Sequence, residues 1–355
     1  MNDFNPEVLI VGDLHIHERL EFPGAIGENP RLLDGLDILD QIATIVNERK
    51  IRYVIFTGDL FELKDKIPNH ILVPFTQKIE TIKKSWETEI IALRGNHDFK
   101  IPEFSTTSIF SSIMFIDDVF TIGLIGKDTS RSIGFIPFYR DWDEFKEKWV
   151  ELHNRLPRPD IIMFHNELPG VYYSAKMKAP KEWDFPYHKD VSYVGGHIHK
   201  PQILKLTNNS IDFIGIPYQL DFDDVGTKTD YHVKLYDINT NVFKDVTLKY
   251  PWFVEINLDK KAEGIIKTKG NYVRIIGTVE PKDRPRVRQM RDTMITGGAK
   301  GVQVKVKYVT EHVSRIKAEK SDYRGVISQY LRGSATTLDR DKLLQTGLNL
   351  LEKSK

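Results

Sequence analysis

The chain has 355 residues and a mass of 41.1 kDa, a size that corresponds to one large domain with attachments or to two domains. With 40% hydrophobic and 28% charged residues, it can bury a core, which argues against disorder as its main state. The absence of cysteine excludes disulfides, thiolate metal sites, iron–sulfur clusters and cysteine nucleophiles, so any metal must bind through His, Asp, Glu or Asn.

The net charge of +1 is distributed unevenly along the chain. From residue 251 to the end there are 22 Lys and Arg against 12 Asp and Glu, a charge of +10, which leaves −9 for residues 1–250. An acidic larger part joined to a basic smaller part suggests two different tasks. The first apolar run, Val8 to Val11, is too short for a signal peptide or a membrane span. We therefore expect a cytoplasmic protein that is not secreted and does not contact a membrane.

Short apolar runs alternate with longer amphipathic stretches in the first 250 residues. Apolar residues at spacings of three and four predict a helix over residues 31–50, and a second helix is predicted over 69–85. Strand, helix, strand, helix, strand is the pattern of parallel strands joined by crossover helices, and the later strands indicate a second sheet or an extension of the first. The predicted strands lie within residues 7–15, 51–59, 88–98, 132–139, 160–167, 191–199, 211–218 and 231–238.

The pattern changes after Pro251. Two strands, 271–279 and 301–309, are predicted there with a basic helix between them over residues 282–296, which together form a small α/β unit. Two short helices, 322–331 and 338–351, follow a charged stretch. Such a terminal pair is either a packed tail or an element that docks a partner.

Five of the predicted strands end directly in polar residues that can bind metals. In α/β sheets, sites form in the crevice beyond the carboxyl ends of the strands, so we expect these side chains to converge. Carboxylate, amide and imidazole ligands without thiolate suit Mn²⁺, Zn²⁺, Fe²⁺ or Mg²⁺, and a pair of such ions clamps both oxygens in phosphoester hydrolysis. The sequence therefore predicts a dinuclear hydrolase. The residues are Asp13, His15, Asp59, Asn96, His97, Asp98, His165, His197 and His199.

In chain order these motifs read Asp-x-His, Gly-Asp, Gly-Asn-His-Asp, a lone His and Gly-His-x-His, which resembles the signature of the calcineurin-like metallophosphoesterases. The sequence further resembles the SbcD-type nuclease subunit of double-strand-break repair complexes, especially the shorter recombination nucleases of tailed phages. Residues 165–178 and 214–220 are similar to segments of those phage proteins, and the resemblance covers most of the chain. It implies a four-layer α/β/β/α metallophosphoesterase domain over residues 1–250, a small α/β capping domain that faces DNA over 251–312, and a helical partner-binding tail over 313–355.

The resemblance also implies roles for single residues. His97 would face the scissile phosphate and aid the leaving oxygen, and Asp98 would orient His97 by accepting a hydrogen bond from its ring. The cofactors would be two divalent ions, with Mn²⁺ expected and Mg²⁺ the alternative, which lower the pKa of a water so that hydroxide attacks the phosphorus in line. One ion would be held by Asp13, His15 and His199, the other by Asn96, His165 and His197, and Asp59 would bridge them.

Three residues depart from the family pattern or add to it. Some cellular members have a histidine three residues after the bridging aspartate, whereas this chain has Glu62, so no role at that position follows from the resemblance. His17 is an extra imidazole that either touches a phosphate or is an ordinary loop residue. Arg94 either pairs with a phosphate or forms a salt bridge within the fold.

As a whole, the resemblance implies a Mn²⁺-dependent DNA nuclease for recombination, repair or replication, in the cytoplasm of a bacterial host if a phage encodes it. It implies 3′ to 5′ exonuclease action on duplex ends and endonuclease action on single strands, in a homodimer that works with an SbcC-like ATPase. DNA phosphates would be met in a salt-dependent manner by His17, Arg94, Arg284, Arg286, Arg288, Lys305 and Lys307. The ATPase would dock on Tyr330, Leu331, Leu343, Leu344, Leu348 and Leu351.

Other functions remain open on the sequence alone. A small-molecule or cyclic-nucleotide phosphodiesterase could share the fold, because the metal signature does not name a substrate. A protein phosphatase fits less well, because that branch typically has Gly-Asn-His-Glu where this chain has an aspartate at residue 98. A scaffold without activity would not need all seven proposed ligands together with His97.

Overall fold

The computed structural model describes residues 5–22, 28–64, 66–98, 111–127, 129–172, 179, 186–225, 231–260, 267–309, 325, 327–328, 330–331 and 339–353. The chain divides into two compact units. One comprises Met1–Gly277 with Arg286–Lys305, and the other comprises Thr278–Pro285 with Val306–Lys355. The three-part division predicted at residues 250 and 312 stays a prediction.

The first sheet has six strands and holds the N-terminal strand, β1, near its centre. β1 pairs in parallel with β2, with Val11 opposite Phe56, and antiparallel with β11. Val8 and Ile10 of β1 face the second sheet, whereas Leu9 and Val11 face the helices, as the period of two along a strand requires. In spatial order the strands are β12 (Val242–Thr247), β11 (His232–Asp237), β1 (Asn5–Val11), β2 (Ile51–Phe56), β3 (Glu89–Leu93) and β4 (Met114–Ile116).

The second sheet also has six strands, and its central strands run parallel. β6 pairs with β7, β7 with β8 and β8 with β10, all in parallel, while the two outer strands pair antiparallel with their neighbours. In spatial order the strands are β5 (Phe120–Ile125), β6 (Ser130–Ile136), β7 (Ile161–Phe164), β8 (Ser192–Gly195), β10 (Ser210–Phe213) and β9 (Gln202–Lys205).

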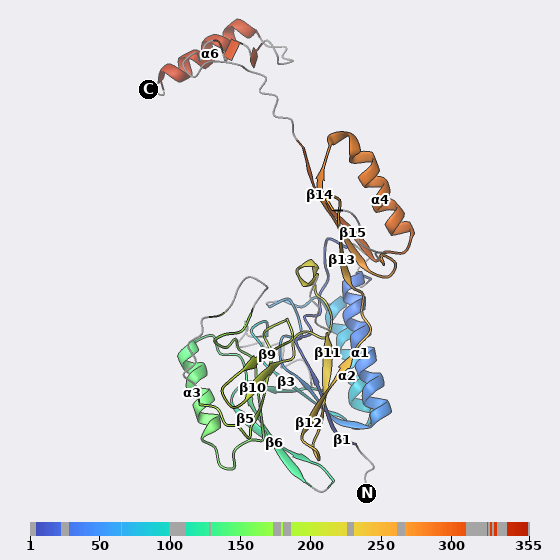
Figure 1. Ribbon diagram of the computed structural model, residues 1–355, viewed down its shortest axis with the longest axis vertical. Coiled ribbons are helices and arrows are strands. Elements are labelled where there is room, and N and C mark those ends of the chain that lie inside the picture. The colour runs from blue at the N-terminus through green and yellow to red at the C-terminus, as the bar shows by residue number, and fades with distance from the viewer. Residues whose placement is uncertain are drawn as a thin grey trace. The chain divides into compact units, whose positions relative to one another are not determined.

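Helices cover the outer faces of both sheets (Figure 1). α1 (Pro30–Arg49) and α2 (Asn69–Ser85) pack on the first sheet, and α3 (Trp142–His153) packs on the second. Three apolar clusters separate the layers: one between α1, α2 and the first sheet, one between the two sheets, and one under α3. The predicted four-layer α/β/β/α sandwich is therefore confirmed.

A third, three-stranded sheet follows in the chain. It consists of β13 (Phe253–Asn257), β14 (Tyr272–Val279) and β15 (Gly301–Tyr308). The short 3₁₀ helix η3 (Pro281–Asp283) precedes α4 (Arg284–Thr296). Four aromatic side chains, Phe22, Phe222, Phe253 and Tyr272, form a small core of their own, and Phe222 belongs to the short 3₁₀ helix η2 (Phe222–Asp224). In the C-terminal unit, α6 spans Arg340–Lys353.

The predicted elements agree closely with the observed ones. Each of the eight predicted apolar runs overlaps a strand, α2 has the predicted bounds, and α1 begins and ends one residue before its prediction. Of the predicted helix 322–331, the residues that the structure describes are helical. The elements that were not predicted are β4, β5, β9, β12, β13 and α3. Among the described residues, no helix is long and apolar enough to cross a membrane.

The missed helix α3 has clear signals in its sequence. Asp141 caps its N-terminus by accepting from the backbone N–H groups of Asp143 and Glu144, and Phe145, Trp149 and Leu152 are buried at spacings of four and three. The short strands were missed for a different reason. β9 and β12 lie at sheet edges and consist of exposed and half-buried residues, so neither carries a continuous apolar run.

Candidate active site

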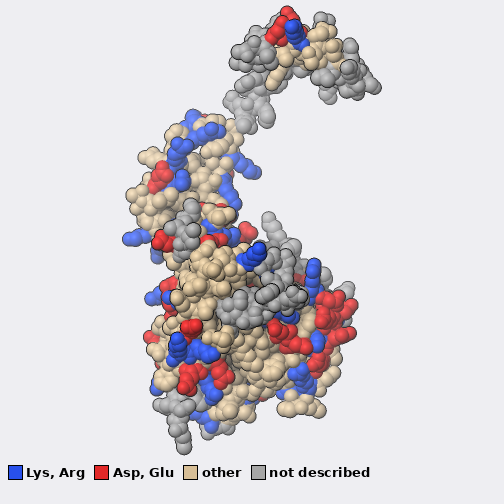
Figure 2. Space-filling model, turned by 180° about the vertical axis from the view of Figure 1, so that it is seen from behind, with Lys and Arg blue, Asp and Glu red and all other residues tan. Residues whose placement is uncertain are grey.

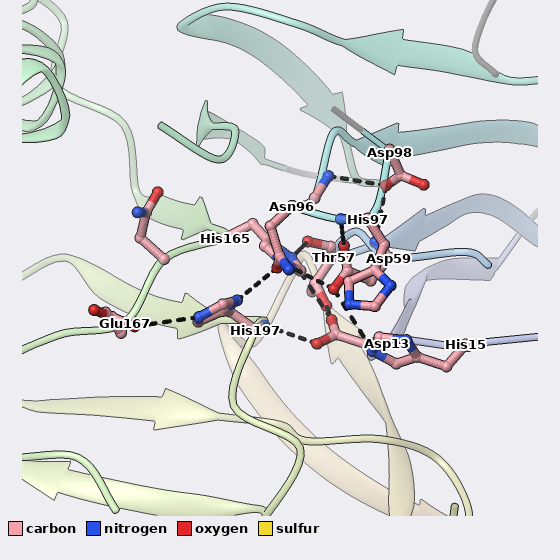
Figure 3. Close-up of polar contacts among 12 residues, drawn as sticks. Asp13, His15, Thr57, Asp59, Asn96, His97, Asp98, His165, Glu167 and His197 are labelled. Atoms are coloured by element: carbon pink, nitrogen blue, oxygen red, sulfur yellow. Dashed lines mark hydrogen bonds and ion pairs between the residues drawn. The ribbon is translucent and has the colours of Figure 1, made fainter. Parts of the chain in front are cut away.

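Parallel pairing brings five strand ends together from two different sheets. β1, β2 and β3 end at Val11, Phe56 and Leu93 in the first sheet, while β7 and β8 end at Phe164 and Gly195 in the second. The polar residues that follow these ends contact one another across the two sheets (Figure 3). The predicted convergence is therefore observed.

The first group of possible metal ligands consists of Asp13, His15 and His199. Asp13 is fully buried and is held by two hydrogen bonds, one from the Thr57 hydroxyl at 3.0 Å and one from the His197 backbone at 2.8 Å. The rings of His15 and His199 lie edge to face with centroids 4.5 Å apart. These are the three residues predicted to hold one ion.

The second group consists of Asp59, His165 and His197, and a third group of His15, Asp59 and His97 shares one residue with each of the other two. The Asn96 side-chain oxygen lies among them, 3.2 Å from His165 Nε2 and 2.7 Å from His197 Nδ1. Asp59 Oδ2 lies 3.5 Å from His165 Nε2 and 3.6 Å from His15 Nε2. Asp59 thus stands between the two groups, which is the place predicted for a bridging ligand.

The electrostatics of the site favour positive charge between the carboxylates. Burial opposes ionisation of Asp59, but His165, His15 and His97 around it hold its pKa well below the ordinary value. Burial likewise opposes a charged His165, yet Asp59 and Asp13 raise its pKa to about 9. A bound divalent cation would supply the positive charge that this pocket stabilises.

The side chains present fit divalent metals. His15 is fully buried, and neither of its ring nitrogens has a hydrogen-bond partner among the residues that the structure describes. A buried ring nitrogen without a partner is costly in an ordinary core, whereas it is required of a metal ligand. His165 donates from Nδ1 to the Thr57 carbonyl at 2.7 Å, which leaves Nε2 for an ion, as is usual for metal-binding histidines.

Two glycines allow the ligands to approach this closely. A Cβ on Gly58 would lie 2.8 Å from Cε1 of His165, and a Cβ on Gly95 would lie 2.5 Å from the backbone nitrogen of Asp59. Three of the predicted ligands themselves have left-handed backbone conformations, with φ of 45° at His15, 47° at Asp59 and 72° at His197. Such conformations are uncommon outside glycine and cluster at functional sites.

His97 and Asp98 are not arranged as predicted. The carboxylate of Asp98 accepts from the backbone N–H groups of Asp59 and Gly95, both at 2.9 Å (Figure 3), instead of from the ring of His97. His97 Nδ1 donates to the backbone carbonyl of Glu62 at 2.6 Å. Burial and the nearby charge of Asp59 raise the pKa of Asp98 to about 7. The expectation that Asp98 orients His97 is corrected: the contact that orients this ring comes from Glu62.

His17 and Arg94 are engaged within the fold. His17 is buried, and its ring contacts the His15 carbonyl and accepts from Arg19 Nε at 3.1 Å. Arg94 donates to the Asp117 carbonyl at 3.2 Å. The predicted contacts of both side chains with phosphate stay predictions.

The predicted DNA-facing residues on α4 and β15 are exposed. This holds for Arg284, Arg286, Arg288, Lys305 and Lys307. In the tail, Tyr330 is exposed, while Leu331, Leu343, Leu344 and Leu348 are half-buried. Leu351 belongs to α6, but its side chain lies outside the described residues.

Three residues of the site were not predicted. Thr57 holds both Asp13 and His165, Glu62 touches His15 and His97, and Glu167 lies 3.4 Å from His197 Nε2. Thr57 directly follows the predicted strand that ends at Phe56, Glu62 comes three residues after Asp59, and Glu167 comes two residues after His165. Their positions beside the motifs were the signal that could have identified them.

Comparisons with known proteins extend the description. The chain is 24% identical over 284 residues, 76% of its length and 67% of the relative's, to a protein of Sulfurisphaera tokodaii named DNA double-strand break repair protein Mre11. Among solved structures, it is similar to Yfce, a phosphoesterase from E. coli, with a TM-score of 0.34, 9% identity and coverage of 68% of this chain and 100% of that one. It is also similar to the Pseudomonas putida nuclease MPE, with a TM-score of 0.27, 14% identity and coverage of 67% and 87%.

Both TM-scores lie below 0.5, so the assignment of this chain to a family does not depend on them. The profile of the family described as calcineurin-like phosphoesterase matches residues 6–201, more than half of the chain. This range contains all of β1 except Asn5, the strands β2, β3, β7 and β8, and every residue of the candidate ligand groups. The chain therefore belongs to the calcineurin-like phosphoesterase family and is a metal-dependent phosphoesterase.

Proposed function

We propose that this chain is a Mn²⁺-dependent DNA nuclease of the SbcD type, close to the recombination nucleases of tailed phages. It degrades duplex ends in the 3′ to 5′ direction and cleaves single strands, in DNA recombination, repair or replication. The observation that carries the proposal is the convergence of the candidate ligands from five strand ends. The similarity to a protein named for double-strand break repair supports DNA as the substrate.

In this proposal the site would take two ions. Asp13, His15 and His199 would hold one, Asn96, His165 and His197 would hold the other, and Asp59 would contribute to both. When bound, such ions stabilise charge on the phosphoryl oxygens and lower the pKa of water.

His97 is the proposed proton donor to the leaving oxygen. Its ring is half-buried at the site, and its edge packs against His15 with centroids 4.7 Å apart. Because Nδ1 donates to the Glu62 carbonyl, Nε2 is the ring nitrogen that can deliver a proton to the leaving group.

The basic C-terminal part supports a polyanionic substrate. Figure 2 shows Lys and Arg side chains (blue) gathered on the part of the molecule that carries α4, and Arg284, Arg286, Arg288 and Arg291 of this helix are exposed. Contacts between such side chains and phosphates weaken as salt rises. An affinity for DNA that is the same at low and high salt would contradict this part of the proposal.

The proposed assembly follows from the resemblance to SbcD-type nucleases. The chain works as a homodimer with an SbcC-like ATPase in the cytoplasm of a bacterial cell, and the tail over residues 313–355 docks that partner. Deleting residues 321–355 should abolish association with the ATPase and leave Mn²⁺ binding unchanged. Loss of metal binding in the shortened chain would contradict this division of tasks.

Cleavage of end-labelled linear duplex DNA tests the activity. The purified chain is incubated with Mn²⁺, with Mg²⁺ and with EDTA, and hydrolysis of bis(p-nitrophenyl) phosphate is followed in parallel. Mn²⁺-dependent shortening from the 3′ end is the expected result. Hydrolysis of the small diester while DNA stays intact, also after addition of an SbcC-like ATPase with ATP, would refute the nuclease assignment and favour a small phosphodiester as the substrate.

A further inference from the structure

We propose that the exposed ring of Trp252, backed by the ring of Tyr250, is a stacking platform for the unpaired bases of single-stranded DNA. The inference rests on the proposed function in its choice of DNA. It adds a contact for the strand that is separate from the candidate metal ligands and from the predicted DNA-facing residues of α4 and β15.

An aromatic column leads from the core to the surface at this point. Tyr231 is fully buried in the core cluster between the first sheet and its helices, and the ring of Tyr250 stands edge to face against it with centroids 5.9 Å apart. The ring of Trp252 packs against Tyr250 with centroids 5.1 Å apart. Tyr250 is half-buried, whereas Trp252 is 40% exposed. The outermost ring is therefore supported from the protein side and reaches solvent.

Two backbone hydrogen bonds hold Trp252 in place. Its N–H donates to the side-chain oxygen of Asn271 at 2.9 Å, and its carbonyl accepts from the N–H of Tyr272 in β14 at 2.9 Å. The next residue, Phe253, is buried and stacks on the ring of Tyr272 with centroids 4.8 Å apart. Because this backbone is already fixed, a base that stacks on Trp252 has little protein conformational entropy to remove.

A second tryptophan with the same exposure has different surroundings. Trp86 is also 40% exposed, but Nζ of Lys50 stands over its ring, 5.1 Å from the centroid. Its Nε1 donates to the Asn47 carbonyl at 3.1 Å. A cation of the same chain thus already occupies one face of Trp86, whereas Trp252 has an aromatic ring behind it.

Two lysines flank the pair of rings. Lys249 and Lys267 are exposed. The N–H and the carbonyl of Lys249 are both bonded to the side chain of Gln41 in α1, each at 2.7 Å. The carbonyl of Lys267 accepts from the amide nitrogen of Asn271 at 2.8 Å, and the amide oxygen of this side chain holds Trp252. Both ammonium groups are therefore carried by backbone that is tied to the segment with the two rings.

The charge around the rings favours a polyanion with accessible bases. The chain carries a charge of +10 from residue 251 to its end. Proteins that bind single strands combine such positive charge with aromatic side chains on which bases stack. A duplex keeps its bases stacked on one another and offers these rings no partner. A protein partner is less suitable, because charged side chains such as these lysines are depleted in the cores of protein interfaces.

The test measures binding of a short fluorescent oligo(dT) by anisotropy, in EDTA so that the strand is not cleaved. The full-length wild-type chain is compared with Trp252→Ala and Trp252→Phe, and Trp86→Ala is the matched control because the two indoles are equally exposed. A strand of the same length built from abasic nucleotides offers the same phosphates without bases. Thermal unfolding shows whether each variant is folded.

Trp252→Ala should weaken oligo(dT) binding by about 5- to 150-fold, which corresponds to the loss of one stacked base. The loss should be the same at low and high salt, because stacking releases no counterions, whereas Lys267→Gln should reduce the salt slope by about 0.7. Trp252→Phe should keep most of the affinity. The abasic strand should bind wild type and Trp252→Ala equally, and Trp86→Ala should match wild type on both strands.

Equal oligo(dT) affinity of wild type and folded Trp252→Ala would overturn the proposal, and so would an equal loss of affinity for the abasic strand. Equal affinity with a loss of self-association would assign the rings to a contact between two copies of the chain. If the alanine variant does not fold, tryptophan fluorescence decides: oligo(dT) should quench wild type more than Trp252→Phe, and equal quenching would overturn the platform.

The outcome is independent of the nuclease assignment, because binding is measured without cleavage. A wild-type chain that binds oligo(dT) through Trp252 and leaves DNA uncut with Mn²⁺ would refute the nuclease proposal and leave the platform in place. A wild-type chain that shortens duplex ends, while Trp252→Ala binds oligo(dT) normally, would give the opposite result.

Discussion

Replacing Gly95 by alanine should displace Asp59 and impair the reaction. A Cβ at this position would lie 2.5 Å from the backbone nitrogen of Asp59 and 2.8 Å from its Cγ, where ordinary contacts begin at 3.4 Å. The groups must therefore separate by about 1 Å, and a misplacement of this size at a reactive centre costs about 100-fold in rate. Because Gly95 is not among the residues with positive φ, the added methyl group acts through contact with Asp59 and not through backbone strain.

The assay is hydrolysis of bis(p-nitrophenyl) phosphate with Mn²⁺, together with Mn²⁺ binding and thermal unfolding. Gly95→Ala should lower the rate about 100-fold, weaken Mn²⁺ binding, and destabilise the fold by about 1–3 kcal/mol, as overpacked sites do. Gly123→Ala is the matched control, since a Cβ on this glycine of β5 meets nothing within 4 Å. Wild-type turnover and affinity in Gly95→Ala would refute the reasoning that Asp59 must stand where it does.

Three further outcomes are expected. His97→Ala should bind Mn²⁺ normally and lose about 10²-fold or more in rate, as for a removed general acid; near-normal turnover would exclude His97 from the mechanism. Mn²⁺ at about one hundred times its dissociation constant should stabilise the fold by about 2.7 kcal/mol, seen as a rise in Tm that EDTA reverses and that His199→Ala diminishes; no rise would argue against a bound ion. Burial lowers the pKa of His153 from 6.5 to about 4, so between these values the unfolded chain binds a proton that the native chain does not, and stability should fall as pH decreases through this window. His153→Gln should reduce that fall in urea unfolding series, and an unchanged pH dependence would contradict the assignment.

The convergence of the site could be predicted because it depends on regular structure. Each candidate ligand lies within four residues of the end of a buried strand, as Asp13 does after β1 and His165 does after β7. Parallel strands place their carboxyl ends at one edge, so the identity of the strands determines which side chains meet. Helices are regular as well, so the bounds of α1 and α2 could be predicted from the spacing of their buried residues.

The partners of individual side chains could not be predicted in this way. Asp98 was expected to reach the neighbouring ring of His97, but the chain leaves backbone N–H groups that need acceptors at Gly95 and at Asp59, and buried N–H groups without a partner are costly. The carboxylate of Asp98 satisfies two of them. The spacing of residues in a turn does not reveal whether a carboxylate accepts hydrogen bonds from backbone N–H groups or from a neighbouring ring.

The strained ligands show why Asp98 still belongs to the site. Left-handed conformations outside glycine cost about 1–3 kcal/mol each and persist only where the surroundings enforce them. Here each strained ligand donates its own backbone N–H to another residue of the site: His15 to the Asp59 carbonyl, Asp59 to the Asp98 carboxylate, and His197 to the Asp13 carboxylate. In each case the side chain or the backbone carbonyl of another site residue accepts this hydrogen bond and so fixes the backbone of the strained ligand. Asp98 therefore acts on the site by fixing the conformation of Asp59, and its substitution should disturb Asp59 before it disturbs His97.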